Sequence, residues 1–141
     1  MDGSERPEDF PFRSTDKLRY GDTDRQGHVN NAVFSTFLET GRVEFLHDAS
    51  ASLPDAGAAF VIARLVLDYR AEINWPGSVV IGTRIASVGR SSIRMEQAIF
   101  QGERCVATAE TVIVQMNEQT RKSQPFSPAA AEWLLSFVGS R

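Results

Sequence analysis

The chain has 141 residues, of which 42% are hydrophobic and 23% charged, as in one soluble globular domain and unlike a disordered chain or a disulfide scaffold. Its formal net charge of −3 and its pI near 5.4 argue against non-specific nucleic-acid binding, which depends on lysine and arginine neutralising phosphates. The sequence shows neither the run of about 20 apolar residues that a membrane helix needs nor an export signal. One cysteine and two histidines form neither an internal disulfide nor a closed zinc site. We therefore expect a cytoplasmic protein without a metal.

The chain begins with a polar stretch that contains two prolines. We predict that residues 1–12 are flexible and that residues 13–141 form a single domain. Thr15–Tyr20 predicts a short strand, and the polar residues 21–27 that follow have the composition of a turn.

A long helix is predicted from Asn31 to about His47, because apolar side chains recur there every three or four residues. Asn30 or Asn31 supplies the N-cap. The apolar stripe carries three phenylalanines and Gly41, a residue that permits close backbone approach. This helix needs a large apolar cover, and a sheet is the expected one.

The second half of the chain predicts a sheet followed by a short helix. Gly102–Glu103 has the composition of a tight hairpin turn, and the short connections predict an antiparallel meander. The fold class is therefore α+β, with helices on one side of the sheet. Long unpaired sheet edges favour pairing with a second copy, so we expect a dimer or a dimer of dimers. The predicted strands are residues 60–70, 79–88, 91–100 and 104–116, and the predicted helix is residues 127–138.

The most polar segment, residues 22–31, leads directly into the long helix. Backbone N–H groups at a helix start lack partners within the helix, so they can bind the oxyanion that develops on a carbonyl. Asp24, a few residues upstream, could attack that carbonyl or activate water, and His28 could orient or share a proton. The alternative is that these Asp and Asn side chains only form the hydrogen bonds of a turn and a helix cap.

The run from Tyr20 to Asn31, followed by Phe34, Glu39 and Arg42, closely resembles the opening of the 4-hydroxybenzoyl-CoA thioesterase-like family. The resemblance continues to about Met116. It implies the hotdog fold, in which an antiparallel sheet wraps a long helix. The same run also resembles the Asp…His-Val-Asn-Asn box of plant acyl-carrier-protein thioesterases.

This resemblance implies that Asp24 is the catalytic carboxylate and that the backbone N–H of Asn31 is the oxyanion donor. His28 matches the histidine of the plant box, whereas Gln26 replaces its asparagine, so we keep His28 as an auxiliary catalytic residue. In a second hotdog lineage the catalytic glutamate lies on the helix about two turns beyond the oxyanion donor, and Glu39 matches that position. The alternative for Glu39 is an ion pair with an arginine or a contact with water.

The family binds the nucleotide of coenzyme A near basic residues at strand turns, and Phe34 is expected to contribute to an apolar substrate pocket. Arg64 and Asp68 lie on the strand that we expect to face the dimer seam, so they could contribute to the site of the partner subunit. The residues that match the nucleotide-binding turn are Arg90, Ser91, Ser92 and Arg94.

The resemblance as a whole implies an acyl-CoA thioesterase that uses no cofactor, coenzyme A being part of the substrate. Two alternatives stay open. One is a binding module that holds an acyl thioester without cleaving it, and the other is a hydratase that acts on enoyl thioesters.

Overall fold

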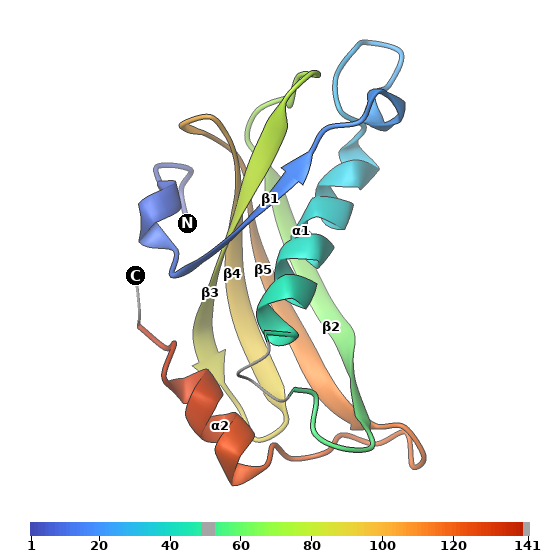
Figure 1. The fold of residues 1–141 in the computed structure, drawn as a ribbon, viewed down its shortest axis with the longest axis vertical. Coiled ribbons are helices and arrows are strands. Elements are labelled where there is room, and N and C mark those ends of the chain that lie inside the picture. The colour runs from blue at the N-terminus through green and yellow to red at the C-terminus, as the bar shows by residue number, and fades with distance from the viewer. Residues whose placement is uncertain (49–52, 140–141) are drawn as a thin grey trace.

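The computed structural model describes residues 1–48 and 53–139. Five strands form one antiparallel sheet, and a long helix lies across one face of it (Figure 1). The strands are β1 (Phe12–Lys17), β2 (Ala58–Tyr69), β3 (Ser78–Val88), β4 (Ser92–Gln101) and β5 (Arg104–Asn117). The α-helices are α1 (Asn31–Leu46) and α2 (Pro128–Leu135), and the 3₁₀ helices are η1 (Pro7–Asp9) and η2 (Tyr20–Asp22). This arrangement confirms the predicted α+β class.

The strand order is β1-β3-β4-β5-β2. The turn at Gly102, where φ is +62°, joins β4 to β5 as predicted. The predicted meander is correct for β3, β4 and β5 but wrong for β2, which pairs with β5 rather than with its neighbour in sequence, β3. Hydropathy patterns identify a strand without identifying its partner, so the sequence could not reveal this crossover.

The first strand begins earlier than predicted, at Phe12 rather than Thr15, and ends at Lys17. Tyr20 belongs instead to η2, because the Asp22 carboxylate accepts hydrogen bonds from the backbone N–H of Arg19 at 3.0 Å and from its side chain at 3.3 Å. Before the strand, Phe10 is fully buried in edge contact with Phe100. The flexibility of residues 1–12 stays a prediction.

The helix α1 fits the sheet closely at Gly41. A Cβ at this position would lie 2.6 Å from the Ile81 side chain and 3.0 Å from the Gln97 amide nitrogen, so only glycine allows this approach. Phe34 and Phe37 pack into one apolar cluster, and Phe45 into a second that α2 covers. Both clusters lie between α1 and the sheet, as the apolar stripe predicts.

Asp55 links the segment before β2 to β5 and α2. Its carboxylate accepts hydrogen bonds from the Ser127 N–H at 2.8 Å, the Ser127 hydroxyl at 2.7 Å and the Gln115 amide at 3.0 Å. Burial acts to raise the pKa of Asp55, but these hydrogen bonds outweigh it and hold the pKa below its ordinary value of 3.8.

We predict that Asp55→Asn lowers the free energy of unfolding by about 1.5 kcal/mol or more at pH 7, since hydrogen bonds to a charged acceptor are lost. A carboxyl whose pKa is depressed by folding stabilises the folded state above its ordinary pKa. That contribution disappears as pH falls through the folded-state pKa. The difference between the two proteins should therefore shrink below pH 3.8. Urea unfolding at pH 7 and pH 3 measures it, with the exposed Glu118→Gln as control. An equal difference at both pH values would contradict the assignment.

Candidate active site

The loop between η2 and α1 is held by backbone hydrogen bonds and by Val29, which is buried in the apolar core. Thr23 and Val29 form a β-bridge, and the Asp24 N–H donates to the His28 carbonyl at 2.8 Å. The turn is closed at Gly27, where φ is +85°. The Val29 N–H donates to the Ile73 carbonyl at 2.9 Å, which fixes the loop to the segment after β2.

The Asp24 carboxylate is exposed and takes part in this turn through one oxygen. Its Oδ1 accepts hydrogen bonds from the N–H groups of Gln26 at 2.8 Å and His28 at 3.2 Å. Within residues 1–48 and 53–139, Oδ2 accepts none. The predicted turn role is therefore present. It uses one carboxylate oxygen, Oδ1, and leaves Oδ2 for the predicted chemical role.

The start of α1 presents one free backbone donor. The Asn30 side chain caps the helix by accepting from the Ala32 N–H at 2.9 Å, and the Val33 N–H donates to the Asn30 carbonyl at 2.9 Å. The Asn31 N–H donates to no acceptor among the described residues. Tyr69 donates to the Asn31 carbonyl at 2.9 Å, so the end of β2 holds the residue that carries this N–H.

His28 precedes the start of α1 in the chain, and Phe34 lies in the first turn of the helix. Nε2 of His28 is 3.0 Å from the Glu72 carboxylate, a partner that sequence reasoning missed because nothing in the pattern around Glu72 points to position 28. Phe34 is only 2% exposed and makes an edge contact with the Tyr69 ring, which is 51% exposed. Tyr69 thus forms the accessible aromatic surface here, and a substrate contact by Phe34 stays a prediction.

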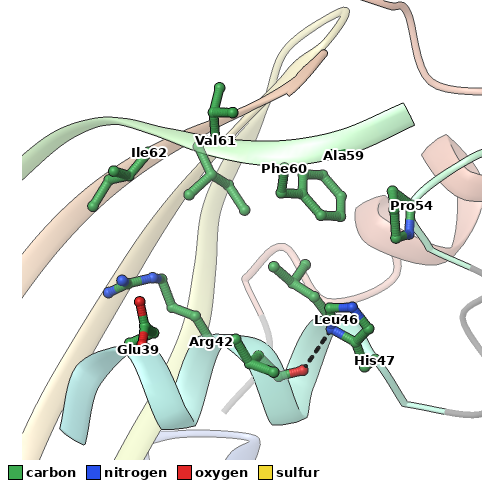
Figure 2. Close-up of a pocket in the computed structure, with 11 residues that line it drawn as sticks. Glu39, Arg42, Leu46, His47, Pro54, Ala59, Phe60, Val61 and Ile62 are labelled. Carbon is green, nitrogen blue, oxygen red and sulfur yellow. Dashed lines mark hydrogen bonds between the residues drawn. The ribbon is translucent and has the colours of Figure 1, made fainter. Parts of the chain in front are cut away.

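A cavity of about 450 Å³ lies further along, between the second half of α1 and the first half of β2 (Figure 2). Its size is typical of small-molecule sites. Its polar lining is Glu39 and Arg42 of α1, which point toward the cavity, and His47 directly after the helix (Figure 2). Glu39 forms no ion pair within 4.0 Å in the part of the chain that the structure describes. Apolar lining residues are Leu46, Phe60, Ile62 and Ile113.

The predicted nucleotide-binding residues lie in the turn between β3 and β4 and at the start of β4. Arg90 is exposed, Ser91 and Ser92 are half-buried, and Arg94 forms an ion pair with Glu110 at 2.8 Å. The Arg90 carbonyl accepts from the Phe126 N–H at 3.0 Å, which places this turn beside the segment that leads into α2.

The structure therefore brings Asp24, His28 and Asn31 together and separates them from residues 90–94. The first group lies at the beginning of α1, and the turn lies beyond the other end of the helix (Figure 1). At 1.5 Å per residue, the 16 residues of α1 span about 24 Å. Glu39 lies between the two ends, about 12 Å along the axis from Asn31.

Comparison with known proteins shows the family. The model of the thioesterase-like superfamily matches residues 18–134, so this chain belongs to that superfamily, a class of thioester hydrolases. The acyl-CoA thioester hydrolase YbgC of Escherichia coli is 29% identical over 106 residues, which cover 73% of this chain and 79% of YbgC.

Two solved structures place the fold. A Thermus thermophilus thioesterase complexed with coenzyme A and Zn is 32% identical, with a TM-score of 0.77 over 89% of this chain and 98% of that one. The Pseudomonas aeruginosa protein PA5185 superimposes with a TM-score of 0.85 over 96% of each chain at 24% identity, which shows the fold alone. The predicted hotdog fold and thioesterase family are confirmed.

The described residues contain no group of three His, Cys, Asp or Glu side chains placed to hold a metal ion. None of the helices in these ranges has both the length and the apolar character needed to cross a membrane.

Proposed function

We propose that the protein is an acyl-CoA thioesterase, which hydrolyses an acyl thioester to the free acid and coenzyme A. The observation that carries this proposal is the Asn31 N–H at the start of α1, which has no acceptor among the described residues and directly follows the loop that carries Asp24. The identity of YbgC as an acyl-CoA thioester hydrolase and the coenzyme A in the Thermus structure support the choice of thioester.

The chemistry uses the helix start as an oxyanion site. The thioester carbonyl oxygen accepts a hydrogen bond from the Asn31 N–H, and the positive end of the helix dipole stabilises the charge that develops on it. Oδ2 of Asp24 then either attacks the carbonyl carbon or removes a proton from an attacking water. In the first route the carbon–sulfur bond breaks, the thiolate leaves and takes up a proton, and water hydrolyses the resulting anhydride.

His28 is an auxiliary residue in this scheme. Glu72, 3.0 Å from its Nε2, holds the ring beside the Asp24 turn. Glu39 is the alternative catalytic carboxylate, because it is exposed at the rim of the cavity. The reaction needs no resident metal or organic cofactor, and we place it in the cytoplasm.

The active enzyme is a homo-oligomer built from dimers in which β2 pairs with β2 of a second copy. Of the two edge strands, β1 is short and carries three charged residues, features that discourage edge pairing. β2 has 12 residues, and its apolar side chains Ile62 and Val66 are 52% and 40% exposed. Burying this edge removes both unpaired backbone groups and exposed apolar surface.

Two-fold symmetry in such a dimer would unite the separated parts of the site. In an antiparallel β2 pair, the Tyr69 end of one copy lies beside the Ala58 end of the other. Since β2 runs antiparallel to α1, the start of α1 in one copy then lies near the end of α1 in the other. The Asp24 loop of one copy then approaches the cavity and the Arg90–Arg94 turn of its partner. This arrangement accounts for a thioester held at one end of α1 and a nucleotide held by residues from the other.

We predict that Asp24→Asn lowers kcat at least about 100-fold, the scale of a lost base or nucleophile. Asparagine retains an Oδ1 acceptor for Gln26 and His28, so the turn should keep its shape. Thiol release from a panel of acyl-CoAs measures the rate, and an unchanged melting temperature shows that the fold is intact. Glu39→Gln is the matched variant. Undiminished turnover in Asp24→Asn, with a loss in Glu39→Gln, would move the chemistry to Glu39.

A binding module remains the second candidate, since the turn bonds already give Asp24 a structural purpose. The wild-type protein separates the two functions. Tight acyl-CoA binding by calorimetry, without thiol release over hours, would establish binding and exclude the hydrolase.

We predict that Ile62→Lys weakens self-association at least about tenfold, because it brings a lysine charge into the paired edge. The mass in solution, measured by light scattering across a concentration series, should change from oligomer to monomer. Gln119→Lys adds the same charge in the exposed turn after β5 and should leave the mass unchanged. A monomeric wild-type protein would contradict the proposed assembly.

A further inference from the structure

Arg42 is a buried cation that none of the steps above uses. It is only 9% exposed, and Nη1 donates a long hydrogen bond of 3.4 Å to Oε1 of Gln97. None of the ion pairs within 4.0 Å across residues 1–48 and 53–139 includes Arg42. A guanidinium has five N–H donors, and burying it without partners is costly, so most of its hydrogen-bonding capacity is available to a ligand.

Gln97 fixes the position of this cation. It is fully buried on β4, and its Nε2 donates to the Leu38 carbonyl and to the Thr83 hydroxyl, each at 3.1 Å. Both donors of the amide are thereby used, and Oε1 is left facing Arg42. Three buried polar groups in a row between two apolar clusters cost stability where their hydrogen bonds are only partly made, as those of Arg42 are.

The Arg42 side chain points to a place where a ligand can reach its unused N–H donors. Arg42 projects from α1 into the space between the helix and β2, beside the apolar wall that includes Ile62 (Figure 2). Burial lowers the pKa of the guanidinium, and the nearby Glu39 carboxylate offsets part of this effect. Glu39 is exposed to solvent. Its carboxylate therefore offsets part of the effect of burial on Arg42 but does not use the N–H donors of the guanidinium.

We propose that the cavity receives the acyl group and that Arg42 binds a carboxylate at the end of the acyl chain remote from the thioester. The preferred substrate is then the monothioester of a dicarboxylic acid, its methylenes against Leu46, Phe60 and Ile62 and its free carboxylate on the guanidinium. Arginine suits this role because its planar N–H groups match a carboxylate in pairs. The inference rests on the proposed thioesterase function, for which it names the substrate class.

The test compares suberoyl-CoA with octanoyl-CoA, which have equal chain length and differ in the terminal carboxylate. We expect the wild-type kcat/KM to favour suberoyl-CoA about tenfold or more, the scale of a charge-assisted hydrogen-bonded pair. Arg42→Met should abolish or reverse that preference and leave octanoyl-CoA turnover in place. Arg42→Lys should keep part of it. Arg13→Met, which removes an exposed arginine from the opposite sheet edge, should not change the ratio. Shorter and longer dicarboxylic thioesters extend the comparison.

A second measurement separates this inference from the hydrolase itself. Calorimetry with the monoamide of suberic acid and with octanamide, in which a neutral amide replaces the thioester, reports binding without catalysis, so it decides the role of Arg42 even if no thioester is cleaved. The monoamide, which keeps the remote carboxylate, should bind the wild-type protein more tightly than octanamide, and Arg42→Met should remove the difference. If Arg42→Met does not fold, the wild-type and Arg42→Lys results decide. Equal preference for the charged and neutral chains in the wild-type protein, across all lengths, would overturn the proposal.

Discussion

The close contact of α1 with the sheet at Gly41 sets how near the helix, and the candidate functional groups that it carries, lie to the sheet. Because the glycine has no Cβ, the helix backbone approaches Ile81 and Gln97 more closely than any other residue would permit. The neighbouring Arg42 is thereby brought within reach of Gln97, and the apolar residues before and after it fill two separate clusters. A larger side chain at position 41 would force the helix, or its neighbours Ile81 and Gln97, to shift.

The two ends of the helix offer complementary chemistry. The N-terminal end has an N–H without an acceptor in the described part of the chain and a carboxylate on a hydrogen-bonded turn, which suits a reacting carbonyl. The C-terminal half borders an apolar cavity with a buried cation, which suits the recognition of a chain. One copy holds these features half a helix length or more apart, and this separation, together with the exposed β2 edge, supports the proposed site shared between two copies.

The sequence predicted the elements well where local pattern determines them. The long helix was identified from its apolar spacing and its cap, and it begins at Asn31 as expected. The loop residues Asp24, His28 and Asn31 were identifiable because they are neighbours in the chain and match a family motif. The first strand was misplaced because Tyr20 continues an apolar pattern, whereas hydrogen bonds from Arg19 to Asp22 turn the chain there. The pairing of β2 with β5, the contact of Glu72 with His28 and the support of Arg42 by Gln97 join residues 38 or more positions apart, and no periodicity encodes such contacts.

The central claim is that the Asn31 N–H polarises the thioester carbonyl, and infrared spectroscopy tests it most directly. An acyl-CoA labelled with ¹³C at the carbonyl would be bound to the Asp24→Asn protein, which should leave it intact. Asn31→Pro removes the N–H, and Asn31→Ala controls for the loss of the side chain. The helix should tolerate proline, since proline is favoured at the first helical position and Asn30, at ψ 139°, already has the backbone conformation that precedes proline. We predict that the carbonyl band of the bound thioester shifts to lower frequency with Asn31 or Asn31→Ala and returns to its solution value with Asn31→Pro. An equal shift in the proline variant would show that the oxyanion site lies elsewhere.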